Sequence, residues 1–123
     1  MQFTIQGELC DLNTYIDAER RNRFLASKIK KSETERVAWE AVAGKVCTVP
    51  EENYPVTIFL TWYVKDFKKD ADNITFAKKF IADGLVEAGV LKDDSRKYVA
   101  LIQDIEVAVD KANPRIEVRI MPV

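Results

Sequence analysis

The sequence VTIFLTWYV, residues 56–64, places large apolar side chains on both faces of an extended chain. Pro55 precedes this run, and a basic segment, residues 65–69, follows it. A short apolar run of β-branched and aromatic residues is typical of a strand that is covered on both faces. We therefore expect residues 56–64 to form a central strand of a sheet.

Three further segments alternate apolar with polar residues, as strands do when one face is buried. They are residues 2–9, 98–109 and 116–120. The pair Asn113-Pro114 predicts a turn between the last two segments, so we expect those two strands to form an antiparallel hairpin.

Two regions carry apolar residues at helical spacing. The first extends from residue 14 to Gly44, and within it Ser32 and Glu35 match a capping box. This region forms either one bent helix or two helices that meet near Ser32. The second region covers residues 72–88. The resulting β-α-β-α-β-β order predicts a single α+β domain over residues 1–123, with helices packed on a mixed sheet.

The composition supports a single domain of this kind. The chain has 123 residues, of which 47% are hydrophobic, and this is enough for a buried core. No apolar run approaches the roughly 18 to 20 residues that span a membrane, and the alternating start of the chain does not match a secretory signal. We therefore expect Cys10 and Cys47 to be free thiols in a reducing cytoplasm. We also expect no membrane contact and no organic cofactor.

Two clusters of basic residues stand out against a net charge of −1. The first contains six basic residues and no acidic one: Arg20, Arg21, Arg23, Lys28, Lys30 and Lys31. The second consists of Lys65, Lys68 and Lys69. Local positive charge of this kind is suited to holding a phosphate backbone. The alternative is a solvated helix face and a charged loop.

Carboxylates gather around the helical region at 72–88. Asp70 and Asp72 stand at its start, and Asp93-Asp94 follows its end. The chain contains no histidine, so a metal site would have to use oxygen ligands, which suit Mg²⁺, Mn²⁺ or Ca²⁺. Carboxylates, a nearby lysine and basic runs together suggest metal-assisted cleavage of a phosphodiester. The alternatives are a helix cap at Asp70 or Asp72 and an ordinary turn at Asp93-Asp94.

Helical geometry distinguishes the two lysines of this region. On a continuous helix, residues seven positions apart, as Asp72 and Lys79 are, fall within about 20° of each other. Lys78 would be turned roughly 120° away from Asp72. Lys79 is therefore the better candidate to share a site with Asp72, and an exposed, solubilising lysine is the alternative.

Residues 69–95, KDADNITFAKKFIADGLVEAGVLKDDS, resemble the RusA-like Holliday-junction resolvases. These are small endonucleases, many of them encoded by phages and prophages. The family pattern has Asp-x-Asp-Asn at the head of a helix, a lysine within the helix, then Asp-[Ala/Gly]-Leu and finally Asp-Asp. The resemblance implies that Asp70, Asp72 and Asp94 are metal ligands and catalytic residues.

The resemblance places the catalytic lysine in one of two ways. Alignment backward from Asp83-Gly84-Leu85 places it at Lys79, whereas alignment forward from Asp72 places Phe76 there, and Phe76 carries no charge. The helical region is about one turn longer here than in the best-known members. The resemblance therefore favours Lys79, with Lys78 as the alternative.

The function that the resemblance implies is that of a Mg²⁺-dependent endonuclease, with Mn²⁺ as an alternative metal. It would resolve four-way DNA junctions in recombination and repair by two matched cuts that leave 5′-phosphates. Its partners would be branched DNA, held through phosphate contacts of the two basic clusters, and a second copy of the chain in a homodimer. If encoded by a phage, it would act in the cytoplasm of the bacterial host. The alternatives are a non-catalytic, replication-associated DNA-binding module and a less selective Mg²⁺ nuclease that cuts flaps or forks.

Overall fold

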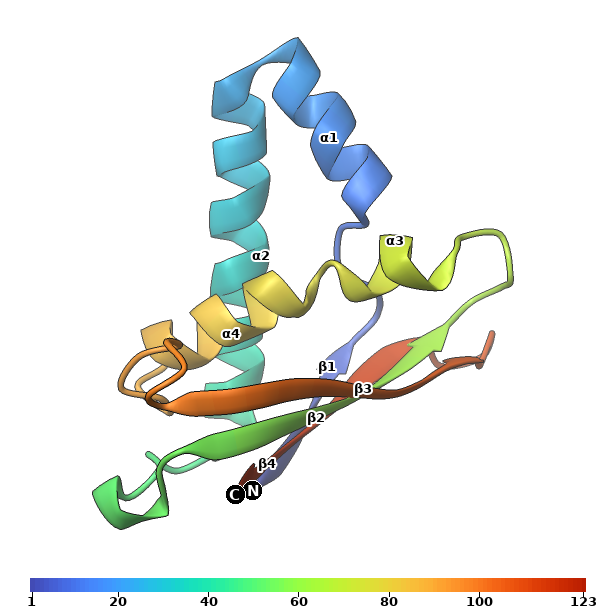
Figure 1. The fold of residues 1–123 in the computed structure, drawn as a ribbon. Helices are drawn as coiled ribbons and strands as arrows, with labels where there is room; N and C mark the ends of the chain where they lie inside the picture. The colour runs from blue at the N-terminus through green and yellow to red at the C-terminus, as the bar shows by residue number, and fades with distance from the viewer.

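Four strands form one mixed sheet in the order β1-β4-β2-β3. The computed structural model describes residues 1–123 (Figure 1). The strands are β1 (Gln2–Gln6), β2 (Val56–Val64), β3 (Val99–Val109) and β4 (Arg115–Pro122). β2 lies inside the sheet, parallel to β3 and antiparallel to β4, and β1 is antiparallel to β4 at the other edge. The prediction of a central strand at residues 56–64 is confirmed.

All helices lie on one face of this sheet (Figure 1). They are α1 (Leu12–Arg21), α2 (Arg23–Ala43), α3 (Ala71–Thr75) and α4 (Lys78–Glu87), with a short 3₁₀ turn at Glu51–Asn53. Leu60 and Trp62 of β2 belong to one buried cluster with Val37 of α2 and Leu85 of α4. The chain is thus a single α+β domain with helices packed on a mixed sheet, as the sequence predicts. None of the helices has the length and apolar character that a membrane span requires.

Gly84 allows α4 to lie directly against α2. A Cβ atom at this position would be 2.6 Å from the Cβ of Val37 and 2.9 Å from the carbonyl oxygen of Thr34. Real Cβ atoms do not approach other atoms so closely, because interiors are already packed at the density of organic crystals. The glycine therefore fixes how near α4, which carries Lys78 and Lys79, comes to α2.

The predicted hairpin between the last two strands is wrong. β4 lies on the opposite side of β2 from β3, and the turn before β4 passes the end of β2, where the N–H of Asp110 donates to the carbonyl of Val64 (2.8 Å). Between β1 and β2, β4 buries Ile116, Val118 and Ile120 almost completely. An edge position beside β3 would leave one side of β4 without a neighbour, so burial favours the interior position.

The expectation that β2 is covered on both faces is also wrong. Its residues alternate between buried and half-buried, and the half-buried set faces away from the helices. On that face the guanidinium groups of Arg119 and Arg115 lie over the rings of Phe59 (5.3 Å) and Tyr63 (3.9 Å). Arginine side chains therefore shield these aromatic rings where a second layer of helices is absent.

The two N-terminal helices meet at Asn22, which corrects the prediction of a bend or junction near Ser32. Asn22 has an extended backbone, and its side-chain oxygen accepts a hydrogen bond from the N–H of Phe24 (2.8 Å), which caps α2. Ser32 and Glu35 lie inside α2, which is 21 residues long. A single asparagine with a free side-chain oxygen was sufficient to end one helix and begin the next.

The predicted helix at residues 72–88 is divided into α3 and α4. Phe76 and Ala77 separate them, and the N–H groups of Ala77, Lys79 and Phe80 each bond to the carbonyl three residues before, the tighter spacing of a 3₁₀ turn. The ring of Phe76 packs against those of Tyr15 (5.4 Å) and Phe80 (5.5 Å). Asp72 and Lys79 therefore lie on different helices, and the single-helix geometry that grouped them is wrong.

Candidate functional site

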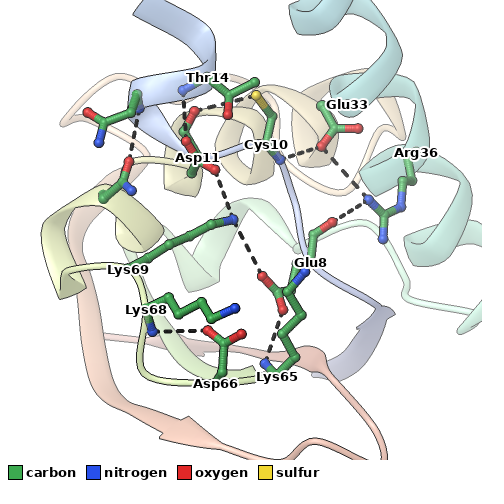
Figure 2. Close-up of polar contacts among 12 residues, drawn as sticks. Glu8, Cys10, Asp11, Thr14, Glu33, Arg36, Lys65, Asp66, Lys68 and Lys69 are labelled. Atoms are coloured by element: carbon green, nitrogen blue, oxygen red, sulfur yellow. Dashed lines mark hydrogen bonds and ion pairs between the residues drawn. The ribbon is translucent and has the colours of Figure 1, made fainter.

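The segment that leads into α3 is bound to the start of α1 by an ion pair. The Nζ of Lys69 lies 2.8 Å from Oδ2 of Asp11 and 3.8 Å from Oε1 of Glu8 (Figure 2). The other oxygen of Glu8 accepts a hydrogen bond from the N–H of Lys65 (3.0 Å). Both ends of the basic segment 65–69 are thus held against the strand-to-helix connection after β1.

Asp11 combines this ion pair with a helix cap. Its Oδ1 accepts a hydrogen bond from the N–H of Thr14 (2.8 Å) at the start of α1. Burial by itself would raise the pKa of Asp11, but the hydrogen bonds from Lys69 and Thr14 outweigh it, and the pKa is lowered. The carboxylate is therefore charged at neutral pH and holds Lys69 beside it.

Asn73 makes a second connection between the same segments. Its buried side-chain oxygen accepts a hydrogen bond from the N–H of Asn13 (2.9 Å), the second residue of α1. A buried amide without a partner would be costly, so this bond fixes the start of α3 relative to α1. The asparagine of the Asp-x-Asp-Asn pattern is therefore a positioning residue in this chain.

Asp70 and Asp72 stand on this fixed segment with free carboxylates. Asp70 occupies the N-cap position of α3, yet its side chain makes no capping hydrogen bond, and its backbone carbonyl accepts the N–H groups of Asn73 and Ile74 (3.1 and 3.2 Å). Both aspartates are exposed, and neither takes part in an ion pair. The start of α3 therefore presents two unpaired oxygen ligands to solvent.

Lys79, Asp83 and Asp94 form a second charged group. The Nζ of Lys79 lies 3.3 Å from Oδ1 of Asp83 and 3.6 Å from Oδ2 of Asp94. Partial burial acts to lower the pKa of Lys79, but the two carboxylates outweigh it, and the pKa is raised above that of a free lysine. The structure thus places Lys79 beside Asp94, and the resemblance assigns both residues to one catalytic site.

Lys78 has a different environment. Its Nζ lies 2.5 Å from Oδ2 of Asp104 on β3, and the other oxygen of Asp104 accepts a hydrogen bond from the indole N–H of Trp62 (2.9 Å). Lys78 is therefore engaged in joining α4 to the sheet. Of the two lysines, Lys79 is the one beside an aspartate of the expected site.

The carboxylates do not form one cluster. No group of three acidic or cysteine side chains is placed to hold a metal ion, so Asp94, which pairs with Lys79, does not complete a metal site with Asp70 and Asp72. Mg²⁺ commonly keeps several waters and is held by one or two carboxylates together with substrate phosphates. Asp70 and Asp72 supply unpaired carboxylates of the kind that such a Mg²⁺ ion uses.

The basic residues that the sequence assigns to DNA contact do not form one continuous group. Arg20, Arg21 and Arg23 lie where α1 meets α2. Lys28 lines a cavity of about 760 Å³, together with Lys65 and Lys69. Lys30 and Lys31 line a groove between α2 and α4, across from Asp83 and Glu87. Lys68 is exposed, whereas the ion pair with Asp11 already engages Lys69.

Cys10 lies in the same cavity, beside the ion pairs of Asp11 and Glu33 (Figure 2). Burial, with Asp11 and Glu33 nearby, raises the pKa of its thiol to about 11. The thiolate is therefore scarce at neutral pH, which argues against a nucleophilic role. Neither Cys10 nor Cys47 forms a disulfide, so the prediction that both are free is confirmed.

Sequence reasoning missed Glu8, Asp11 and Asp104, which position the candidate site. Only Asp11 had a local signal, since an aspartate three residues before Thr14 at the start of a helix is typical of an N-cap. The contacts of Glu8 and Asp104 join residues that are far apart in the sequence. No spacing pattern marks such contacts.

No family model matches the chain, and no curated protein shows significant similarity to it.

Proposed function

We propose that this protein is a Mg²⁺-dependent endonuclease that cuts branched DNA, with four-way junctions as the preferred substrate. The observation that carries the proposal is the group formed by Lys79 and Asp94, which the fold brings within 3.6 Å of each other. Its counterpart is the pair of free carboxylates at the start of α3. Phosphodiester cleavage uses oxygen ligands for a metal ion and a cation that stabilises charge on the phosphate, and in this proposal Asp70 and Asp72 supply the ligands and Lys79 the cation.

In this proposal, Asp70 and Asp72 hold the metal together with phosphate oxygens of the DNA. When bound, Mg²⁺ supplies positive charge that polarises the scissile phosphate. The Lys79 ammonium neutralises charge that builds on the phosphoryl oxygens in the transition state. Asp83 and Asp94 offset the partial burial of Lys79, raise its pKa and hold its side chain in place. The resemblance also implies Asp94 as a third metal ligand, but in the free chain Asp94 pairs with Lys79 and does not form one group with Asp70 and Asp72.

Other residues keep these groups in position. The Lys69–Asp11 ion pair and the Asn73–Asn13 hydrogen bond hold the segment that carries Asp70 and Asp72. Precise positioning matters because a displacement of about 1 Å at a reacting centre can cost roughly 100-fold in rate. These contacts therefore serve catalysis indirectly.

Resolution of a four-way junction needs two matched cuts, so the active form is proposed to be a homodimer with one site in each subunit. The cuts would leave 5′-phosphates. A phage-encoded enzyme of this kind would work in the bacterial cytoplasm.

One observation favours a second candidate, a non-catalytic DNA-binding module. The three aspartates that the resemblance assigns to metal binding do not form one group in the free chain. A module of this kind would keep the basic surfaces and use Asp94 only as a partner of Lys79.

A cleavage assay separates the two candidates. A labelled four-way junction, a fork, a flap and a linear duplex are each incubated with the purified chain and Mg²⁺, Mn²⁺ or EDTA. The proposal expects paired cuts in the junction that require the metal and that Asp72→Asn abolishes while leaving junction binding intact. Asp93→Asn is the matched control, because Asp93 is an exposed aspartate with no ion pair and no assigned role.

Two results would count against the proposal. If the pure chain binds junctions but never cuts them with either metal, the non-catalytic module is correct. If junction, fork, flap and duplex are cut at equal rates, the protein is an unselective nuclease.

A further inference from the structure

The corner between α1 and α2 exposes an aromatic side chain among arginines. Phe24 is 68% exposed and Leu25 is 40% exposed, although both are large apolar residues. Arg20 and Arg21 lie in the last turn of α1, and Arg23 begins α2 with its guanidinium 5.2 Å from the centre of the Phe24 ring. Exposed apolar side chains grouped in this way are typical of a contact surface.

The corner is held by two hydrogen bonds and projects from the domain. A single residue, Asn22, joins the two helices, and its side-chain oxygen accepts the N–H of Phe24 (2.8 Å). Its own N–H donates to the carbonyl of Ala18 (2.9 Å). In Figure 1 this corner is the end of the helical pair farthest from the sheet. Phe24 can therefore reach a partner that the sheet and α4 do not contact.

The charge around the corner selects a polyanion as the partner. Three arginines, Arg20, Arg21 and Arg23, stand at the corner itself, whereas the acidic residues of α1, Asp17 and Glu19, precede it in the sequence. Two copies of the chain that met at this corner would bring these positive charges together. Phosphates between the arginines would instead neutralise them and release counterions.

We propose that the α1–α2 corner recognises the branch point of DNA, with Phe24 stacked on an exposed base pair and Arg20, Arg21 and Arg23 on the flanking phosphates. This inference rests on the proposed function for its choice of branched DNA. In a continuous duplex every base pair is already stacked on both sides, so Phe24 has no free base face to contact. A branch point exposes such faces, and stacking of a base on an aromatic ring is sequence-tolerant.

Binding measured without cleavage tests the inference. The full chain in EDTA is titrated against a four-way junction and a linear duplex of matched length, with 2-aminopurine beside the branch point as a stacking probe. Phe24→Ala is expected to weaken junction binding roughly 10-fold, to change duplex binding less than about 2-fold and to remove the change in 2-aminopurine fluorescence. Arg23→Ala should weaken binding to both DNAs and lower the salt slope by about one.

The matched control is Trp39→Ala, since Trp39 is an aromatic residue on the same helix and is 70% exposed. It should leave both affinities unchanged. Because Phe24 and Trp39 both lie outside the core, circular dichroism should show that each variant folds.

Several results would overturn the inference. The first is that Phe24→Ala binds the junction as tightly as the wild type or loses affinity equally for junction and duplex. The second is that this variant no longer forms a dimer. The third is that Phe24 is needed for binding to phosphatidylserine vesicles while the chain does not bind the junction. The proposed function fails independently, in the cleavage assay: a chain that never cuts but binds junctions through Phe24 would refute the nuclease and support this inference.

Discussion

The Nζ of Lys69 lies 2.8 Å from Oδ2 of Asp11, and this ion pair joins the residue before Asp70 to the N-cap of α1. The side chain of Asp11 is largely buried and also caps α1 through Thr14. One carboxylate thus stabilises a helix and positions the segment that presents Asp70 and Asp72. The stability of the fold and the geometry of the candidate site are coupled at this residue.

Replacing Asp11 by alanine should therefore destabilise the protein. The variant loses the cap of α1 and leaves Lys69 without its nearest partner, so we expect a loss of about 1–3 kcal/mol in the free energy of unfolding. Urea denaturation followed by circular dichroism measures it. Asp17→Ala is the control, because Asp17 is an exposed aspartate of the same helix with no ion pair, and it should cost less than about 0.5 kcal/mol. Equal losses in the two variants would contradict a special role for Asp11.

The contribution of Asp11 should also depend on pH. Its pKa is lowered from 3.8 in the folded protein, because the hydrogen bonds from Lys69 and Thr14 outweigh the opposing effect of burial. A carboxyl group with a lowered pKa stabilises the fold when ionised, so its contribution is complete above roughly pH 5 and is lost as the pH falls through 3.8 to the folded pKa. The difference in unfolding free energy between the wild type and Asp11→Asn should shrink over this range. A difference that is constant from neutral pH to pH 3 would refute this linkage.

The fold was predictable where its signals are local. Alternation in residues 2–9 and 116–120 predicted strands because residues on one face of a strand share one environment. The hairpin was predicted wrongly because the partner of β4 depends on which position buries Ile116 and Ile120 best. A bend or a junction was expected near Ser32 instead of Asn22 because both residues are good helix caps, and sequence spacing does not rank them.

In the candidate site, too, the sequence predicted the features that depend on neighbouring residues and missed those that depend on contacts between distant ones. Asp70 and Asp72 were correctly expected at the start of a helix, since aspartate before a helical pattern is a local signal. The break after Thr75 depends on Phe76 packing against Tyr15, a contact with another helix. Spacing left Asp94 as an ordinary turn residue, and only the resemblance linked it with Lys79.

The close contact at Gly84 gives a prediction about helix packing. Gly84→Ala would place a Cβ 2.6 Å from the Cβ of Val37, so α4 would have to move away from α2. Overpacking of this kind should cost about 1–3 kcal/mol in the free energy of unfolding and should disturb Lys79 on the same helix. Thermal unfolding and the cleavage assay measure the two effects. Glu87→Ala, an exposed change on α4, is the control, and a fully stable Gly84→Ala would show that the helices separate freely.

Lys79 should be needed for cleavage and not for stability. It is the more exposed of the two lysines, and ion pairs at such positions contribute little to folding. Lys79→Ala should therefore unfold at the same urea concentration as the wild type. If its ammonium stabilises charge in the transition state, the rate of junction cleavage should fall by about 100-fold or more. Single-turnover cleavage with saturating enzyme measures the rate without the influence of DNA binding.

Lys78→Ala should show the opposite pattern. This change removes the partner of Asp104, whose other oxygen accepts a hydrogen bond from Trp62, so a half-buried carboxylate loses its counter-charge. We expect a loss of about 1 kcal/mol in the free energy of unfolding and a change in Trp62 fluorescence, with cleavage reduced much less than in Lys79→Ala. Because the two lysines are adjacent and chemically identical, each variant controls for the other. If Lys78→Ala abolishes cleavage while Lys79→Ala leaves it intact, the roles assigned to the two lysines are reversed.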